Sequence, residues 1–351
     1  AEIIKGGMPP EYGTRMSSVL NVEFREGDKY DYKGKVGVGL LSSQMQFEGP
    51  IKYEKSSFIF SARRTYADVV MKPFLSKDSE IKGLGCYFYD LNGKLSFNLS
   101  EKDKLTITGF HGKDLFKYEN DKFTMGFDMN WQNSFGVVKW SHIFNKKLYF
   151  DVSANVTDYE LDVSAMEQNY YLDYISGVRD YVGKTDWTFV PNESNKFKTG
   201  VSFTYHKYMP TDLTAMSGSN VFNAIDNINY HTREIAAYIQ HDLQVNDWFQ
   251  VLYGLRYTYF SHIGPFKRFI IDNEYNMNNI DSIIYNRGDV IKSYHLFEPR
   301  INTRFQIAEN QSIKLSYSLN RQAANLVAMM DNSMPTDVWL PSTDLFEPQL
   351  T

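Results

Sequence analysis

The chain of 351 residues contains no arrangement of side chains that is typical of catalysis. No GxSxG, HExxH or phosphate-binding glycine loop is present. The seven histidines are scattered, and His231 and His241 stand ten residues apart on one predicted strand, too far apart to share a metal ion. Cys86 is the only cysteine, which excludes an internal disulfide and a cysteine-based zinc site. We therefore expect no enzyme activity, no cofactor and no bound metal.

A few cations on or beside predicted strands could instead bind a ligand. Arg63 and Arg64 end a strand at the mouth of a long loop, and Lys198, Arg256 and Arg304 lie on the polar faces of later strands. Clustered cations attract an anionic ligand such as a ferric chelate, or they hold another segment of the chain. The alternative is that these side chains only solvate a wet surface.

The elements that carry these side chains are long strands with one apolar and one polar face. Residues 196–208, KFKTGVSFTYHKY, alternate between apolar residues such as Phe197 and Val201 and polar residues such as Lys198 and Ser202. The same alternation recurs in residues 148–157, 249–259 and 313–320. The sequence lacks a run of about 18 apolar residues, its mean hydropathy is −0.43, and 16% of its residues are aromatic. These features predict an all-β fold, an antiparallel transmembrane β-barrel of which about twelve strands are present; a soluble β-sandwich is the alternative.

The connections between the predicted strands are alternately short and long. Short charged turns are predicted near residues 52–55, 101–104, 145–147, 192–196, 245–247 and 309–311. Long loops are predicted near residues 66–83, 115–131, 160–180, 209–230 and 263–291, and from residue 322 onward. This asymmetry, together with aromatic residues near strand ends, favours the barrel; the aromatic residues are Tyr66, Tyr149, Tyr208, Trp248 and Tyr259.

The first residues do not follow the strand pattern. Residues 6–27, GGMPPEYGTRMSSVLNVEFREG, combine glycine and proline turns with one short alternating strand. Residues 1–8 lack the basic and apolar regions of a signal peptide, so we expect the chain to begin inside a longer one. The net charge of −5 comes without a Lys/Arg cluster, and nucleic acid is therefore not expected as a partner.

Residues 6–27 resemble the last part of the plug domain of TonB-dependent outer-membrane receptors. Residues 39–51, GLLSSQMQFEGPI, look like the first barrel strand and turn of the Bacteroidetes branch, and residues 298–320 look like a later hairpin of that branch. Residues 334–343, MPTDVWLPST, look like the loop after this hairpin. The resemblance implies an internal fragment, with the plug tail in residues 1–28 and the first half of a 22-stranded barrel in residues 29–351.

The resemblance also implies roles for particular residues. Glu11, Arg15, Glu23 and Arg25 of the plug tail are expected to form ion pairs with the barrel wall, because a removable plug is held by polar contacts. Arg63, Arg64, Lys198, Arg256 and Arg304 become candidates for contact with the plug or a ligand. Asp337 and Trp339 are expected to order an extracellular cap, stiffened by neighbouring prolines.

The function expected from this resemblance is active uptake of a scarce, bulky nutrient through the outer membrane of a Gram-negative bacterium. The nutrient could be a siderophore, haem, cobalamin, a peptide or a glycan, and the partners would be the lipid bilayer and a TonB-type energy-coupling protein. That protein would bind through a segment outside this chain. A passive porin or structural barrel is the alternative, followed by an outer-membrane enzyme.

Overall fold

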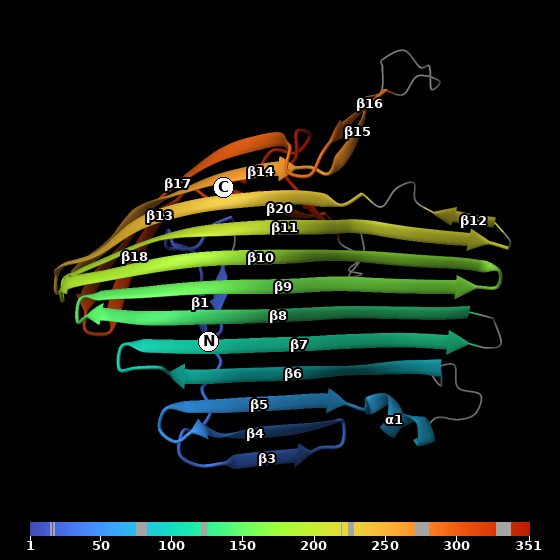
Figure 1. The fold of residues 1–351 in the computed structure, drawn as a ribbon, viewed down its shortest axis with the longest axis horizontal. Helices are drawn as coiled ribbons and strands as arrows, with labels where there is room; N and C mark the ends of the chain where they lie inside the picture. The colour runs from blue at the N-terminus through green and yellow to red at the C-terminus, as the bar shows by residue number, and fades with distance from the viewer. Residues whose placement is uncertain are drawn as a thin grey trace.

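The computed structural model of the chain describes residues 1–14, 16, 18–74, 83–120, 125–218, 220–223, 228–270, 281–327 and 338–351. These residues form one large curved sheet of 14 strands, in which every pair of neighbours is antiparallel (Figure 1). The prediction of an all-β, antiparallel fold is confirmed. Along the sheet the strands are β3 (Lys33–Val38), β4 (Ser42–Lys52), β5 (Ser56–Thr65), β6 (Leu84–Asn98), β7 (Asp103–Asn120), β8 (Met125–Asn145), β9 (Leu148–Glu167), β10 (Tyr170–Asn192), β11 (Asn195–Ser217), β13 (Tyr230–Asn246), β14 (Phe249–Ile263), β17 (Val290–Ala308) and β18 (Gln311–Ser318), with the short β12 (Asn220–Asn223) on β11.

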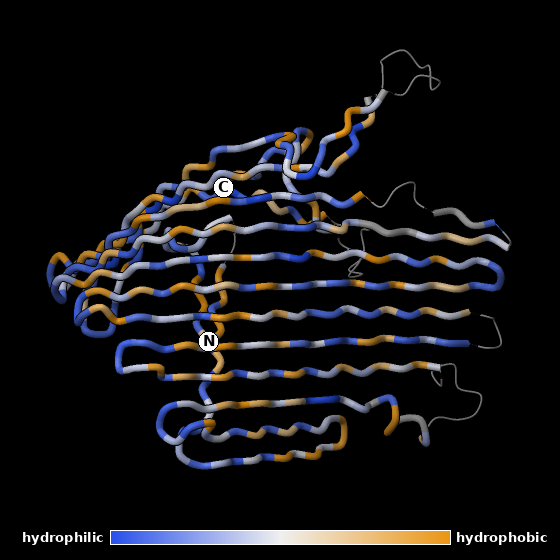
Figure 2. The backbone as a smooth tube through the Cα atoms, viewed as in Figure 1, coloured by the Kyte–Doolittle hydropathy of each residue, from blue (hydrophilic) through white to orange (hydrophobic). Residues whose placement is uncertain are grey.

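The two faces of the sheet differ in polarity, as the alternation predicts (Figure 2). On β13 the side chains of Thr232, Glu234 and Gln240 are buried, whereas Ile235 and Ile239 are 43% and 60% exposed. Successive residues of a strand point to opposite faces, so the buried polar residues share one face and the exposed apolar residues the other. We call these the inner and outer faces. This distribution is the reverse of that in a water-soluble sheet.

The predicted short turns are all present, but three of the predicted long loops contain strands. Strands β9 and β10 run through residues 160–180 and are joined by a tight turn at residues 168–169. Strands β7 and β8 likewise extend into residues 115–131, and β11 continues to Ser217 within residues 209–230. The alternation continues in the extensions of β8 and β9 with the two faces exchanged, since Leu161 and Val163 are buried on the inner face and Glu160 and Asp162 point to the outer face. Residues 39–51, expected as the first strand of the wall, form a turn and β4, and β3 precedes them.

Aromatic side chains form two belts on the outer face. The turn-side belt, near the short turns, includes the ring pairs Phe150–Trp187 at 4.4 Å, Phe197–His241 at 4.0 Å and Phe249–Phe305 at 4.8 Å. The loop-side belt includes Tyr181–Tyr205 at 6.3 Å, Tyr205–His231 at 5.9 Å and Tyr259–His295 at 5.3 Å. About 26 Å of strand separates the two belts along β11. Between them lie the exposed Val201 and Phe203.

Tyr208 does not belong to either belt. Its side chain is 1% exposed and lies on the inner face, because it is an even number of residues from the inner-facing Lys198. The prediction that it lies near a strand end is wrong, because β11 continues to Ser217. Trp248 lies beside a short turn, is exposed and stacks on Phe305 of the turn-side belt. Tyr149 also lies beside a short turn and is exposed, but it is an even number of residues from Thr157 and is on the inner face.

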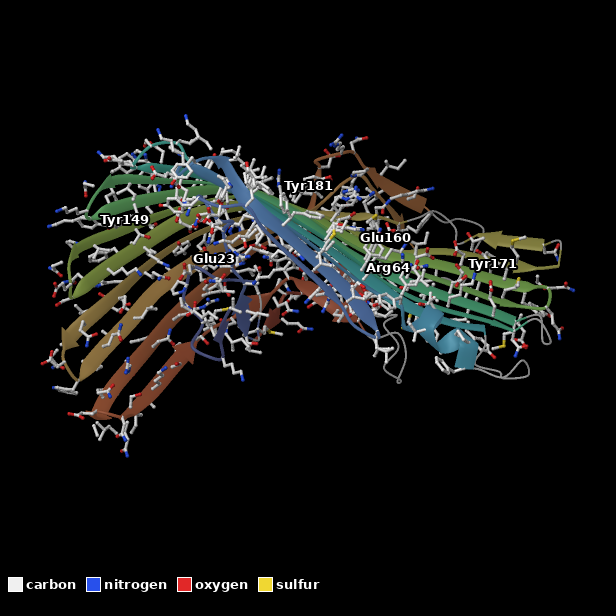
Figure 3. The ribbon with its side chains drawn as sticks, turned by 90° about the horizontal axis from the view of Figure 1, so that it is seen from below. Glu23, Arg64, Tyr149, Glu160, Tyr171 and Tyr181 are labelled. Carbon is white, nitrogen blue, oxygen red and sulfur yellow. The ribbon has the colours of Figure 1, made fainter. Side chains whose placement is uncertain are left out.

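The N-terminal segment, residues 1–28, crosses the strands of the sheet at a steep angle (Figure 1). Its strands β1 (Glu2–Ile4) and β2 (Val19–Asn21) pair with each other and lie within the curve of the sheet (Figure 3). The described residues of the segment have no strand in the main sheet, and they meet the wall at its inner-face side chains and, at Gly27, at the backbone of Phe58.

The C-terminal residues also fold onto the inner face. Strands β20 (Ala324–Val327) and β21 (Val338–Pro341) form a hairpin, and Val338 packs in a buried cluster with Leu161, Val163 and Tyr174. Strands β19 (Arg321–Gln322) and β22 (Gln349–Leu350) pair beside it, whereas β15 (Phe266–Ile270) and β16 (Asp281–Tyr285) project away from the sheet (Figure 1). The described helices are the short α1 (Ala67–Met71) and η1 (Lys72–Phe74), and neither is long and apolar enough to cross a membrane.

Candidate functional site

Four inner-face residues on neighbouring strands form a row that meets residues 8–12 of the N-terminal segment. Lys198 on β11 stands opposite Gln240 on β13, Gln240 opposite Gly254 on β14, and Gly254 opposite Arg300 on β17. Directly opposite residues of antiparallel strands share a face and lie side by side. The strand register therefore assembles these four residues, which we call the clamp row.

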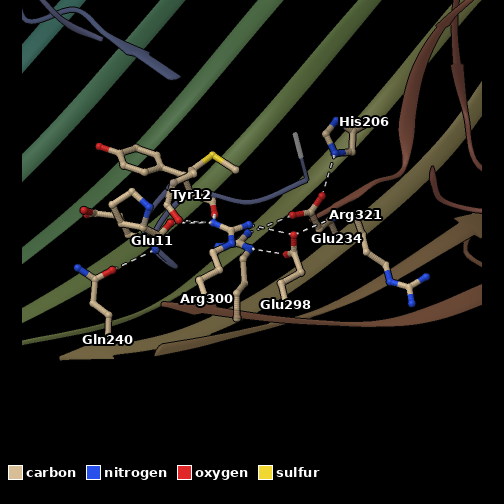
Figure 4. A network of polar contacts seen from close by, with 11 residues as sticks. Glu11, Tyr12, His206, Glu234, Gln240, Glu298, Arg300 and Arg321 are labelled. Atoms are coloured by element: carbon tan, nitrogen blue, oxygen red, sulfur yellow. Dashed lines mark hydrogen bonds and ion pairs between the residues drawn. The ribbon is translucent and has the colours of Figure 1, made fainter. Parts of the chain in front are cut away.

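Arg300 holds the backbone of the N-terminal segment (Figure 4). Its guanidinium donates hydrogen bonds to the carbonyl oxygens of Pro9, at 2.8 Å, of Met8, at 3.4 Å, and of Tyr12. Its side chain is completely buried. The planar fork of an arginine carries five N–H donors, so one side chain can serve several acceptors at once. The charge is balanced by Glu298 on the same strand, 3.0 Å away.

The other members of the clamp row contact Pro10 and Glu11. The ammonium group of Lys198 lies 2.9 and 3.1 Å from the two carboxylate oxygens of Glu11, and the Gln240 side-chain oxygen accepts the Glu11 N–H at 3.3 Å. A Cβ atom at Gly254 would lie 2.9 Å from the Pro10 ring and would overlap the Ile239 carbonyl oxygen. Glycine at position 254 therefore lets the segment approach the wall closely.

A chain of buried charges continues from Arg300 across the wall. Arg256 lies 3.7 Å from Glu298 and 3.4 Å from Glu234, and His206 lies 2.7 Å from Asp180 and 4.0 Å from Glu234. These residues come from β17, β14, β13, β11 and β10. A buried charge is tolerated when partners and hydrogen bonds surround it. The cluster connects the clamp row with the part of the inner face near Asp180.

A second set of polar contacts holds residues 24–28. Lys94 donates to the carbonyl oxygen of Phe24 at 2.6 Å, and Arg25 makes two 2.7 Å hydrogen bonds to the buried carboxylate of Glu48. Glu26 pairs with Lys104 and, at 3.3 Å, with Lys29. Burial acts to raise the pKa of Glu26, but the hydrogen bonds from Lys104 and Lys29 outweigh it and leave this pKa below its ordinary value. The segment is thus attached by ionic and hydrogen-bonded contacts at both ends.

A second cross-strand row lines the inner face nearer the loop side. It consists of residues that stand directly opposite one another on β4 to β11, namely Gln46, Ser61, Asn92, Phe110, Phe135, Thr157, Asp180 and His206. We call it the cavity row, because its members line two cavities of about 610 and 930 Å³.

Phe110 lines both cavities, which therefore adjoin. The smaller cavity also receives Trp339 and Leu326 from the C-terminal hairpin. The ring of Phe24 in the N-terminal segment lies 5.9 Å from that of Phe135. The smaller cavity is thus bounded by the wall and the hairpin, and Phe135 of its lining contacts the N-terminal segment. Concave positions of this kind are typical of small-molecule sites.

The structure places four of the candidate residues in contact between the N-terminal segment and the wall. Glu11 and Lys198 pair with each other, Arg25 pairs with Glu48, and the Arg256 guanidinium lies against Gly13, where a Cβ atom would overlap it. Glu23 is exposed, and no ion pair joins it to another described residue (Figure 3). Arg15 and Asp337 lie outside the described residues.

The remaining candidates lie away from that contact. Arg63 pairs with Asp90 at 2.7 Å. Arg64, the next residue of the strand, lies over the Tyr87 ring on the outer face, away from the N-terminal segment. Arg304 is exposed and donates to Gln306, and Trp339 lines the smaller cavity.

Arg300, Glu298, Glu234 and Gln240 were not singled out from the sequence. Residues 298–300, Glu-Pro-Arg, lie inside a stretch that resembles a family hairpin, and this resemblance was the feature of the sequence that could have pointed to Glu298 and Arg300. The contact of Arg300 with Met8 joins positions 292 apart, and that of Gln240 with Glu11 joins positions 229 apart; a strand pattern does not reveal such contacts.

Comparisons with known proteins agree with this architecture. Residues 83–348 match the family of TonB dependent receptor-like β-barrels. Among solved structures, the ferric-catecholate import receptor Fiu of E. coli K12 is similar, with a TM-score of 0.62, 11% identity, and coverage of 91% of this chain and 59% of that chain. FpvA of P. aeruginosa, solved with pyoverdines, has a TM-score of 0.63, 12% identity, and coverage of 92% and 46%. The outer-membrane alcaligin receptor FauA of Bordetella pertussis has a TM-score of 0.60 and 12% identity, and the match covers 93% of this chain and 50% of that chain.

The chain belongs to the family of TonB-dependent receptor β-barrels, which are transport receptors rather than enzymes. It spans about half the length of the solved receptors that it resembles. No curated protein matches the sequence.

Proposed function

We propose that this chain is part of a receptor for TonB-dependent active uptake of a scarce, bulky nutrient across the outer membrane of a Gram-negative bacterium. Residues 1–28 would be the C-terminal part of the plug domain, and residues 29–351 would be barrel wall of the Bacteroidetes type. The observation that carries the proposal is the clamp row, in which Arg300 and Lys198 hold residues 8–12 across the inner face.

The chemistry of the clamp supports a removable plug. Residues 8–12 and 24–28 are attached by hydrogen bonds and ion pairs. Such contacts can be exchanged for water when a pulling force acts on the segment. An apolar seam would instead expose hydrocarbon to water on removal, at a cost of about 25 cal/mol per Å².

The outer face supports a position in a lipid bilayer. Exposed aliphatic residues such as Val201 lie between the two aromatic belts, and the wall of a transmembrane barrel has an apolar band of about 25 Å between such girdles. Strands β8 to β11, of 20 to 23 residues, are about twice as long as a bilayer requires and would project beyond it.

The test is uptake by cells that produce the full-length receptor from its own gene. Uptake of its nutrient should stop in a strain that lacks the TonB-type protein and should resume when that protein is restored. Uptake that continues unchanged without TonB would refute the proposal and favour a passive porin, the alternative class. A passive porin does not need a segment across its inner face, so the clamped N-terminal segment favours the receptor.

A further inference from the structure

We propose that the paired cavities above the N-terminal segment select an electrically neutral ligand with a flat apolar face and a rim of hydroxyl or amide groups, in preference to a polyanionic metal chelate. The inference rests on the proposed function, because it assigns a substrate class to the receptor. It follows from what the cavity row offers to a ligand and from which charges around it are already paired.

One half of the cavity row is lined by uncharged polar side chains. Gln46, Ser61 and Asn92 stand in register on β4, β5 and β6, and Gln44 adds a further amide to the same cavity. No side-chain hydrogen bond joins Gln44 or Asn92 to another described residue. Primary amides offer both donors and acceptors, and they are therefore suited to hydroxyl and amide groups of a ligand.

The other half is lined by rings. The rings of Phe110 and Phe135 lie 5.5 Å apart with an angle of 22° between their planes. Trp339, from the C-terminal hairpin, lines the same cavity. Parallel rings and an indole provide flat apolar surfaces, on which a sugar ring, an aromatic group or the face of a peptide can stack.

The charges that line the cavities do not favour an anion. The inner-face lining cations are Lys35 and Arg63, against the two carboxylates of Asp90 and Asp180; Asp158 also lines the smaller cavity, but it is adjacent to the inner-facing Thr157 and its side chain points to the outer face. Arg63 is paired with Asp90. Asp158 is paired with Arg179, and Asp180 with His206. Lys35 is exposed on the short strand β3.

The other candidate cations are also engaged or turned away. Lys198 and Arg256 are bound to carboxylates in and below the clamp row, and Arg64 is on the outer face. A ligand with three negative charges would therefore enter a site in which the described lining cations, apart from the exposed Lys35, are already paired with carboxylates, and which has no free cluster of guanidinium groups. Repulsion between like charges is strong in a partly buried site, since the effective dielectric constant there is well below that of water.

The experiment is calorimetric binding to the purified full-length receptor. The probes are a neutral ferric trihydroxamate peptide, a neutral maltohexaose and a trianionic ferric tris-catecholate. We expect at least one neutral probe to bind about tenfold or more tightly than the trianion, a difference of about 1.4 kcal/mol. Trp339→Ala should weaken the neutral probe about tenfold or more, whereas Trp248→Ala, in the turn-side belt, should leave its affinity unchanged.

A charge introduced into the row provides the complementary test. Thr157→Lys adds one positive charge to the cavity row, between Phe135 and Asp180. The preference for the neutral probe should fall about tenfold or reverse. Tighter binding of the trianion by the unaltered receptor, or binding of no neutral probe, would overturn the inference.

Failure of this inference can be separated from failure of the proposed function. A receptor that takes up a trianionic chelate only when TonB is present would retain the proposed function and refute the neutral-ligand inference. A protein that binds the neutral probe but takes nothing up in a TonB-dependent manner would support the neutral-ligand inference and refute the proposed function.

Discussion

At the scale of single residues, Arg300 holds the N-terminal segment by its backbone. It binds three backbone carbonyl oxygens, whose position is independent of the side chains of residues 8, 9 and 12. Its own charge is balanced within the wall by Glu298. Binding to the backbone makes the contact tolerant of sequence change in the segment, while a change at position 300 affects all the hydrogen bonds together.

Arg300→Gln should loosen the N-terminal segment and destabilise the receptor. Glu298 would remain buried without its closest partner, and breaking a buried ion pair costs about 3–5 kcal/mol. We expect a lower thermal midpoint of the full-length receptor and entry of large antibiotics into cells that produce it. Arg304→Gln, four residues along the same strand and exposed, is the matched control and should change neither measurement. Equal effects of the two substitutions would contradict a special role of Arg300.

The attachment of residues 24–28 should depend on pH through Glu26. Because the pKa of Glu26 lies below its ordinary value of 4.5 in the folded protein, its contribution is present above that value and is lost as the pH falls through the lower, folded pKa. Hydrogen exchange of these residues, corrected for its intrinsic pH dependence, should be steady from neutral pH to about pH 5 and faster below. Glu26→Gln should weaken this dependence, and the remainder belongs to Asp28, whose pKa the hydrogen bond from Lys33 holds below its ordinary value. Protection that increases on acidification would show that another group controls the contact.

At the scale of elements, register decides which residues cooperate. The clamp row exists because four strands place Lys198, Gln240, Gly254 and Arg300 directly opposite one another. A shift of one strand by one residue would turn its members to the outer face. The other three residues of the row form hydrogen bonds to the N-terminal segment, whereas Gly254 leaves space for the Pro10 ring.

Gly254→Ala should displace the N-terminal segment without unfolding the sheet. The added methyl group would meet Pro10 and the backbone of β13, neither of which can move aside as a flexible side chain does. We expect faster proteolysis within residues 1–28 of the full-length receptor at an almost unchanged thermal midpoint. Gly183→Ala, on β10, is the control, because nothing lies within 4 Å of its Cβ position. Unchanged proteolysis of the Gly254 variant would mean that the segment tolerates a wider gap.

At the scale of the whole molecule, the sheet has exchanged the usual positions of polar and apolar residues. Buried Glu234, Arg256 and Glu298 lie on the side of the N-terminal segment, and exposed Val201, Phe203 and Ile239 lie on the other. This arrangement is stable only if a non-aqueous environment covers the outer face and a polar segment fills the inner one.

Val201→Arg should impair assembly in the membrane. Val201 is 52% exposed midway between the two belts, and an arginine at the bilayer midplane of a barrel costs about 2–4 kcal/mol. We expect less folded receptor in the outer membrane, measured by heat-modifiable gel mobility. Val290→Arg, at the loop end of β17 and 45% exposed, should have little effect. A similar loss for both variants would place the bilayer elsewhere.

The sequence alone was sufficient to predict the strands, the short turns and the two faces, because alternation and turn residues are local features. It failed in residues 115–131 and 160–180, where strands continue with their apolar residues, such as Leu161 and Val163, on the inner face. It also grouped Arg63 with Arg64, although two adjacent residues of a strand point to opposite faces.

Contacts between distant residues were decided only by the tertiary structure. The sequence nominated Glu11, Arg25, Lys198 and Arg256 by charge, but not their partners, and it overlooked Arg300. Which residues become neighbours depends on the register of several strands and on the path of the N-terminal segment across them, and neither leaves a periodic signal in the chain. Alternation thus determined that the wall has a polar face, whereas register and the crossing segment determined which of its charges are bound and which surfaces remain for a ligand.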